Sequence, residues 1–263
     1  MTNCDIYSEE ISASMEKNKI MKKSIVLLLL IIAGCAGEDA CFSKKGAAVS
    51  QQHQLQGFHT IDIPMNVSAE IIPNDTYKMQ IESFENRIDA ISFSVKDSIL
   101  TIKNEISCQM LKSYETAVLK IYTPNLKRIH SRTQFNVVSN DTLRYPNLYL
   151  LTSIPNEESA STNFNLKLNN NSVTVEDNQV GSFVLKGKTN VLDVKLYGAN
   201  GSVDAKLLKA KTVLSYHRSN QNIHVFAKNK LEGVIASVGN IYVYNKPDTV
   251  KIERLYSGNV VYK

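Results

Sequence analysis

The side chains that could do chemistry are few and are scattered along the chain. His217 and His224 lie close in the sequence, but they occupy different positions of the repeat described below, so we do not expect them to face one metal ion. His53, His59 and His130 have no cysteine or paired carboxylate nearby that could complete a site. The sequence therefore predicts surface histidines and neither a metal centre nor a cofactor.

Carboxylates and lysines offer a second kind of chemistry, general acid–base catalysis on polysaccharides. Asp193, Asp204 and Lys206 are the candidates by their position in the repeat, but charges at outward positions are usually only solvated. The sequence contains no GxGxxG dinucleotide fingerprint, no P-loop and no GxSxG elbow. We therefore predict no catalytic residues and a protein that is not an enzyme, and we keep a polysaccharide-acting β-helix enzyme as the weakest alternative.

The composition argues against nucleic-acid binding. The chain has 263 residues, and its 30 Lys and Arg residues against 25 Asp and Glu residues give a formal net charge of +5. No run of Lys and Arg is longer than two residues, whereas proteins that bind nucleic acids usually gather such residues on one face. Trp is absent, while Val, Ile, Thr and Asn are abundant, which favours strands and turns over helices.

The segment MKKSIVLLLLIIAGC predicts where the protein resides. Lys22 and Lys23 precede an apolar run that is too short to span a bilayer, and the run ends in small residues followed by Cys35. This pattern resembles a bacterial lipobox, in which the cysteine carries lipid and becomes the mature N-terminus. We therefore expect residues 1–20 to be a mis-annotated start, residues 21–34 a lipoprotein signal peptide and residues 35–55 a lipidated tether. Two acyl chains would hold the protein on the membrane, on the periplasmic face of the outer membrane or on the cell surface.

Two further cysteines, Cys41 and Cys108, follow the proposed lipidation site. An exported compartment permits a disulfide between them, and both the paired and the free states remain open.

Alternating apolar and polar residues predict an all-β fold. Residues 56–130 read as an N-terminal region of half-buried antiparallel strands, with a hairpin whose tip is Asp97-Ser98 and one short helix around Glu85–Ala90. From residue 131 to residue 263 a phrase recurs that starts with a small or polar residue and continues with alternating apolar residues. Its copies begin at Thr162, Gly181, Gly201, Gln221, Gly239 and Gly258. A period near 20 residues predicts a β-solenoid with coils of about 19–20 residues.

Several stretches carry a family resemblance. "FHTIDIPMNVSAEII", "LTIKNE" and "LKIYTPNLKRI", followed by coils that end in "YSGNVVYK", resemble the head GIN domain family, the "putative auto-transporter adhesin" head domain found mostly in Bacteroidota lipoproteins. The resemblance covers roughly residues 55–263. It implies an adhesin-like domain of unassigned function and brings no catalytic residues with it.

The coil positions also indicate a candidate binding surface. Tyr242, Tyr244, His224 and Phe226 fall on an outer face of the last coils, where exposed rings can stack on sugars or contact a partner protein. Our leading hypothesis is a lipid-anchored cell-envelope protein that binds an envelope protein or a polysaccharide without catalysis. A structural module that stacks end to end is the main alternative.

Overall fold

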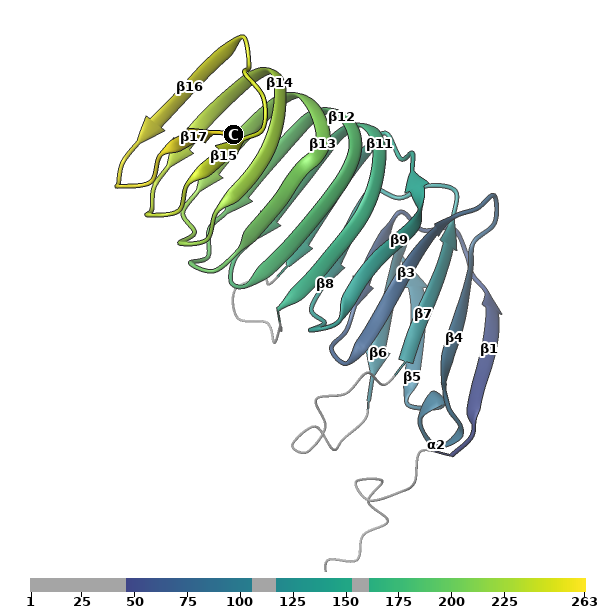
Figure 1. Cartoon of the computed structure of the whole chain (residues 1–263). Coiled ribbons are helices and arrows are strands. Elements are labelled where there is room, and N and C mark those ends of the chain that lie inside the picture. Colours follow the sequence, from purple (N-terminus) through teal and green to yellow (C-terminus); the bar gives the residue numbers. More distant parts are fainter. Residues whose placement is uncertain (1–45, 106–116, 153–160) are drawn as a thin grey trace, which may run out of the picture. The chain divides into compact units, whose positions relative to one another are not determined.

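The described part of the chain is an all-β unit. The computed structural model describes residues 46–105, 117–152 and 161–263, which all belong to one compact unit (Figure 1). Its elements are strands apart from a short helix, α2 (Glu85–Ile88), so the all-β prediction is confirmed. No helix within these three ranges is long and apolar enough to cross a membrane. The predicted signal peptide, the predicted lipidation site Cys35 and the pair Cys41 and Cys108 lie outside the described residues.

The strands in chain order are β1 (Ala48–Gln54), β2 (Thr60–Ile63), β3 (Val67–Pro73), β4 (Lys78–Phe84), β5 (Ile91–Lys96), β6 (Ile99–Asn104), β7 (Ala117–Thr123), β8 (Arg128–Ser131), β9 (Asn136–Leu143), β10 (Asn147–Thr152), β11 (Thr162–Asp177), β12 (Gly181–Leu196), β13 (Ser202–His217), β14 (Ile223–Ile235), β15 (Ile241–Val243), β16 (Thr249–Arg254) and β17 (Val260–Tyr262).

Strand pairing arranges these elements in two ladders. The first ladder runs β1–β4–β7–β3–β9, continues through the first halves of β11, β12, β13 and β14, and ends with β15 and β17. The second ladder runs β5–β6–β2–β8–β10, continues through the second halves of the same four strands, and ends with β16. The four long strands belong to both ladders because each bends in its middle (Figure 1).

From β11 onward, successive coils pair in parallel, and we call residues 162–262 the coil stack. Phe164 pairs with Phe183, Phe183 with Val203, and Val203 with Ile223, so partners lie 19 or 20 residues apart in the sequence. The predicted interior positions are buried: Phe164, Phe183, Val203 and Ile223 are at most 1% exposed. The rings of Phe164 and Phe183 stack with their centroids 5.1 Å apart. The repeat therefore places one apolar side chain above the next along the interior.

Close approach between coils explains why the repeated phrase so often starts with glycine. A Cβ atom added to Gly239 would lie 2.2 Å from the carbonyl oxygen of Gln221 in the preceding coil. One added to Gly201 would lie 2.3 Å from the Asp177 Oδ2 atom. A larger residue at these corners would push neighbouring coils apart.

The N-terminal region differs from the prediction in strand direction. The β5–β6 hairpin is antiparallel as predicted, and Asp97 and Ser98 at its tip have φ values of 51° and 62°, which suit a tight hairpin turn. However, β2 and β3 pair in parallel with β6 and β7 on one side and with β8 and β9 on the other. Half-buried strands alternate in the same way in both directions, so the apolar pattern could not distinguish them.

Part of the expected tether is also a strand. Residues 48–54, which the sequence analysis placed in the segment 35–55, form β1 and pair antiparallel with β4. All seven side chains of β1 are exposed or half-buried. Backbone pairing with β4, the packing of Val49 against the core and the contact of the His53 ring with Phe93 hold this edge strand. A strand with so few apolar residues gives no clear periodicity in the sequence.

Candidate binding surface

Three of the four predicted binding residues meet on the outer face of the last coils. His224 of β14 and Tyr242 of β15 are register partners, and their rings stack with centroids 5.0 Å apart at an interplanar angle of 15°. His224 Nδ1 and the hydroxyl of Tyr244 lie 3.0 Å apart and share a hydrogen bond. We call His224, Tyr242 and Tyr244 the aromatic cluster.

Charged side chains surround the aromatic cluster. Lys263 Nζ lies 5.0 Å from the centroid of the Tyr242 ring, and Lys206 forms a 2.8 Å ion pair with Asp204 in the coil before His224. Burial lowers the pKa of His224; Asp204 opposes this shift, whereas Lys206 and Lys263 add to it. The imidazole is therefore neutral at neutral pH and can share its hydrogen bond with Tyr244 while it stacks on Tyr242.

Phe226 does not join the aromatic cluster. It lies two residues beyond His224 on β14 and is half-buried, but its ring makes no aromatic contact within the described ranges. The sequence analysis also missed another pair of exposed rings: Tyr197 and Tyr216, which are 40% and 37% exposed, have centroids 5.3 Å apart. Tyr216 lies in the second half of β13, and Tyr197 directly follows β12, so the pair lies on the side of the second ladder, which the repeated phrase did not include. The sequence indicated this pair only by two tyrosines that lie about one period apart.

The candidate catalytic residues are divided between the two ladders. Asp193 lies in the second half of β12 and pairs with Lys195 at 3.3 Å, whereas Asp204 and Lys206 lie in the first half of β13. Each aspartate therefore neutralises a lysine on its own strand, and the three residues share no cleft. This arrangement gives them the role of surface ion pairs.

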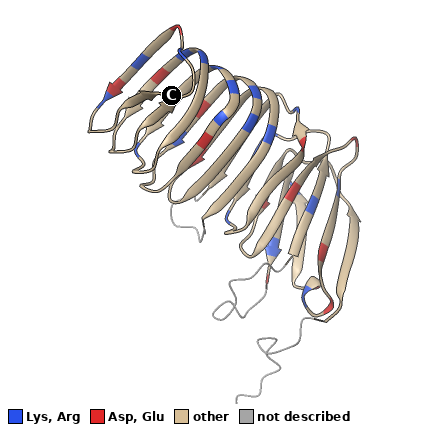
Figure 2. Cartoon of the chain, viewed as in Figure 1, with Lys and Arg blue, Asp and Glu red and all other residues tan. Residues whose placement is uncertain are grey.

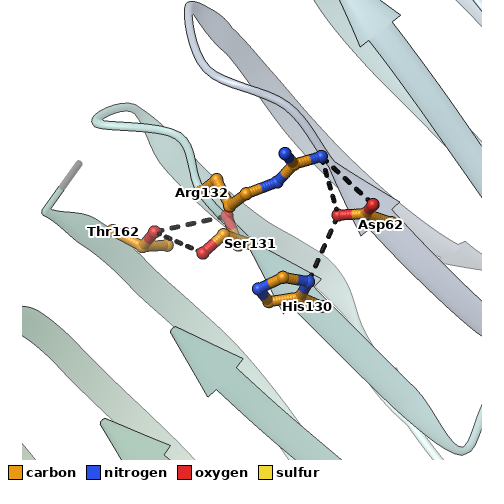
Figure 3. A network of polar contacts seen from close by, with 5 residues as sticks. All are labelled: Asp62, His130, Ser131, Arg132 and Thr162. Carbon is orange, nitrogen blue, oxygen red and sulfur yellow. Dashed lines mark hydrogen bonds and ion pairs between the residues drawn. The ribbon is translucent and has the colours of Figure 1, made fainter. Parts of the chain in front are cut away.

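A polar network on β2 and β8 has two members of a catalytic triad but not its geometry (Figure 3). Asp62 Oδ1 lies 3.3 Å from His130 Nδ1, and Arg132 donates to the same carboxylate at 3.1 and 3.2 Å. Burial alone would raise the pKa of Asp62, but His130 and Arg132 outweigh it and hold the pKa below its usual range.

The nearest hydroxyl cannot serve as the nucleophile of this network. Ser131 is adjacent to His130 on β8, so its side chain points to the opposite face, where Thr162 Oγ1 lies 3.3 Å from its hydroxyl (Figure 3). The free ring nitrogen of His130, Nε2, has no hydrogen-bond partner in the described structure. The network therefore ties β2 to β8 and does not activate a nucleophile.

The two histidines considered for a metal lie in different environments. The prediction of a surface histidine is wrong for His217, which is fully buried in the interior of the coil stack, whereas His224 is on the outer face. Among the described residues, no group of three or more His, Cys, Asp or Glu side chains could hold a metal ion.

The arrangement defines a class of protein: an all-β domain of stacked parallel coils with an apolar interior and varied side chains on its outer faces. The family model described as "Putative auto-transporter adhesin, head GIN domain" matches residues 57–247, and the chain belongs to this family. The resemblance seen in the sequence is thereby confirmed. A search of curated proteins gives no match.

Solved structures share the fold at low sequence identity. A crystal structure titled as a putative adhesin from Bacteroides fragilis is 18% identical, with a TM-score of 0.73, and the match covers 82% of this chain and 97% of that one. A putative adhesin from Parabacteroides distasonis is 17% identical, with a TM-score of 0.57 and coverage of 83% and 98%. A "putative lipid binding protein" from the same species is 13% identical, with a TM-score of 0.58 and coverage of 82% and 97%.

Proposed function

We propose that this protein is a lipid-anchored outer-membrane lipoprotein whose β domain binds a partner through the aromatic cluster, without catalysis. The observation that carries the proposal is this cluster of His224, Tyr242 and Tyr244 on the outer face of the last coils. Membership of an adhesin-like family and the lipobox-like segment ending at Cys35 support the location in the cell envelope.

The geometry of the aromatic cluster favours a protein partner over a stacked sugar. Tyr242 is on β15, which pairs with β14 on one side and with β17 on the other. His224 of β14 stacks on its ring, and Lys263, which directly follows β17, places its ammonium group over the same ring. A sugar that stacks needs a free ring face. The ring edges and the hydroxyl of Tyr242 remain available, and these suit the contacts of a protein interface.

Protease shaving of intact cells tests the location. Release of peptides from residues 57–263, while periplasmic control proteins survive, is the result expected for a cell-surface domain. Mass analysis of the N-terminus should show a lipid-modified Cys35. An unmodified N-terminus upstream of Cys35 would refute the lipid anchor, and full protection from protease would refute a cell-surface position.

Adhesion of whole cells to a cell layer tests the binding role. Cells that carry Tyr242→Ala and Tyr244→Ala together should adhere less than wild-type cells at equal surface amounts of the protein. The matched control is Tyr197→Ala with Tyr216→Ala, which removes a ring pair from the other ladder. Equal adhesion of the wild type and the first variant would exclude the aromatic cluster as the binding surface.

End-to-end stacking is a second candidate because the last coil exposes apolar side chains. Leu255, Tyr256 and Tyr262 are 59%, 66% and 55% exposed, and β16 and β17 are edge strands that each pair on one side. Analytical ultracentrifugation of the wild type and of a Leu255→Glu variant tests this function. Dimers or longer assemblies that the variant loses would favour stacking, and a monomer at all concentrations would exclude it.

A further inference from the structure

Basic side chains from successive coils line a groove that has no function assigned above. The groove has a volume of about 640 Å³, and its cationic residues are Arg144, Lys167, Lys186, Lys188 and Lys209. Figure 2 shows basic residues following one another where the long strands β11 to β14 bend. No Asp or Glu is among the residues that line this groove, which we call the basic groove.

The lysines of the basic groove differ from other lysines of the coil stack in their partners. Lys195 and Lys230 each form an ion pair with a carboxylate two residues away on their own strand. Lys186, Lys188 and Lys209 form no ion pair with any described residue. Like charges on adjacent strands repel one another, so an anion that enters the groove would relieve this repulsion.

The strand register brings lysines of neighbouring coils together. Lys188 and Lys209 are register partners on β12 and β13, so they follow each other at the spacing of neighbouring strands, about 5 Å. Between Lys186 and Lys188, Gly187 has a φ of 113°, and an added Cβ atom would lie 2.1 Å from the carbonyl oxygen of Leu168. The register partners of Gly187 in the flanking coils, Leu168 and Leu208, are buried in the core, whereas Gly187 is exposed between the two lysines.

We propose that the basic groove binds an extended acidic polysaccharide that lies across the coils, with its carboxylates facing the lysines. A row of cations inside a groove suits a single linear polyanion, and Asn169 and Thr142 in the lining can bond its hydroxyls. No aromatic residue lines the groove, whereas single-stranded nucleic acids are bound by stacking their bases on such rings. This inference goes beyond the proposed function, because it adds a second surface and a different class of ligand.

Carboxylates next to Arg144 limit the basic groove at one end. Arg144 also borders a neighbouring cavity of about 640 Å³ whose lining includes Asp75 and Asp141. These carboxylates would repel a polyanion that continued beyond Arg144. We therefore expect the polysaccharide to run from Arg144 towards Lys209 and not past the start of the coil stack.

The test measures binding of the full chain, purified in mild detergent, to polygalacturonate, with uncharged dextran as the comparison. The wild type should bind polygalacturonate but not dextran, and the affinity should fall as salt is added because salt screens exposed charges. A variant with Lys186→Gln, Lys188→Gln and Lys209→Gln should lose about a hundredfold in affinity. This corresponds to about fivefold for each lysine, the factor expected for two unit charges about 4 Å apart in water.

The matched control removes three lysines that already have carboxylate partners: Lys120→Gln, Lys195→Gln and Lys230→Gln together. It lowers the net charge by the same amount and should keep most of the affinity. An equal loss in both variants, no binding at low salt, or tighter binding to single-stranded DNA or to anionic vesicles would overturn the proposal. Circular dichroism and thermal melting verify that each variant is folded. Because the assay uses purified protein, its outcome is independent of where the cell places the protein.

Discussion

Stability should depend on pH through His217, whose ring lies in the apolar interior of the coil stack. Its register partners are Leu196 in the coil before and Ile235 in the coil after, and all three side chains are fully buried. Burial lowers the pKa of His217 to about 4, from an ordinary value of 6.5. The folded protein therefore holds this imidazole neutral at pH values where the unfolded chain takes up a proton.

The sign and the size of the effect follow from this difference. Between pH 6.5 and pH 4 the unfolded state binds more protons than the folded state, so the free energy of unfolding falls as the pH falls. Each pH unit below 6.5 changes it by about 1.4 kcal/mol, so His217 should reduce stability by about 2 kcal/mol at pH 5 relative to pH 8. Asp177, whose pKa is raised by burial, acts with the opposite sign. A direct comparison with a His217 variant separates the two residues.

The variant His217→Leu supplies that comparison because Leu and Ile occupy the same position in the neighbouring coils. Urea unfolding at pH 8 and pH 5 should show that the variant gains about 2 kcal/mol relative to wild type at the lower pH. His59→Asn serves as the comparison variant, since His59 hydrogen-bonds Thr60 outside the coil stack. Identical pH dependence in wild type and His217→Leu would refute a neutral buried His217.

Three further predictions concern the packing of the coils and a turn. Gly239→Ala should lower the free energy of unfolding by about 1–3 kcal/mol, because its Cβ would meet the Gln221 carbonyl oxygen at 2.2 Å, and urea unfolding measures the loss. Phe183→Ala should lower the same free energy by about 3–5 kcal/mol, because it leaves a cavity beneath Phe164; unchanged stability would contradict the interior stack. Ser98→Gly should raise the melting temperature by relieving a positive φ of 62°, worth up to about 1 kcal/mol, and a lower melting temperature would contradict this turn geometry.

The repeat made the interior of the coil stack predictable, whereas strand order was not encoded in any local pattern. Phe164, Phe183 and Val203 stack as expected because a fixed period leaves one way to align successive coils. The parallel insertion of β2 and β3 between strands that follow them in the chain depends on contacts between distant segments. The same reasoning applies to function. Three residues of the aromatic cluster were predicted from coil position. The basic groove was missed because the alignment followed apolar residues, whereas Lys167 and Lys186 stand near the ends of the aligned phrases and Lys188 and Lys209 lie beyond them.

The contrast between inner and outer positions makes the binding proposals testable by substitution. The inner column that contains Phe183, Val203 and Ile223 stays apolar from coil to coil, whereas its outer neighbours change from Val184 to Asp204 and His224. Outer residues therefore satisfy fewer packing constraints, and surface substitutions usually change stability by about 0.5 kcal/mol or less. Tyr242→Ala removes a half-buried ring that packs on His224 and Lys263, so we expect a loss of about 1 kcal/mol, well below that of Phe183→Ala. If chemical denaturation instead showed equal losses for Tyr242→Ala and Phe183→Ala, the aromatic cluster would be part of the structural core. Reduced adhesion of cells that carry Tyr242→Ala and Tyr244→Ala together would then reflect unfolding and not a lost contact.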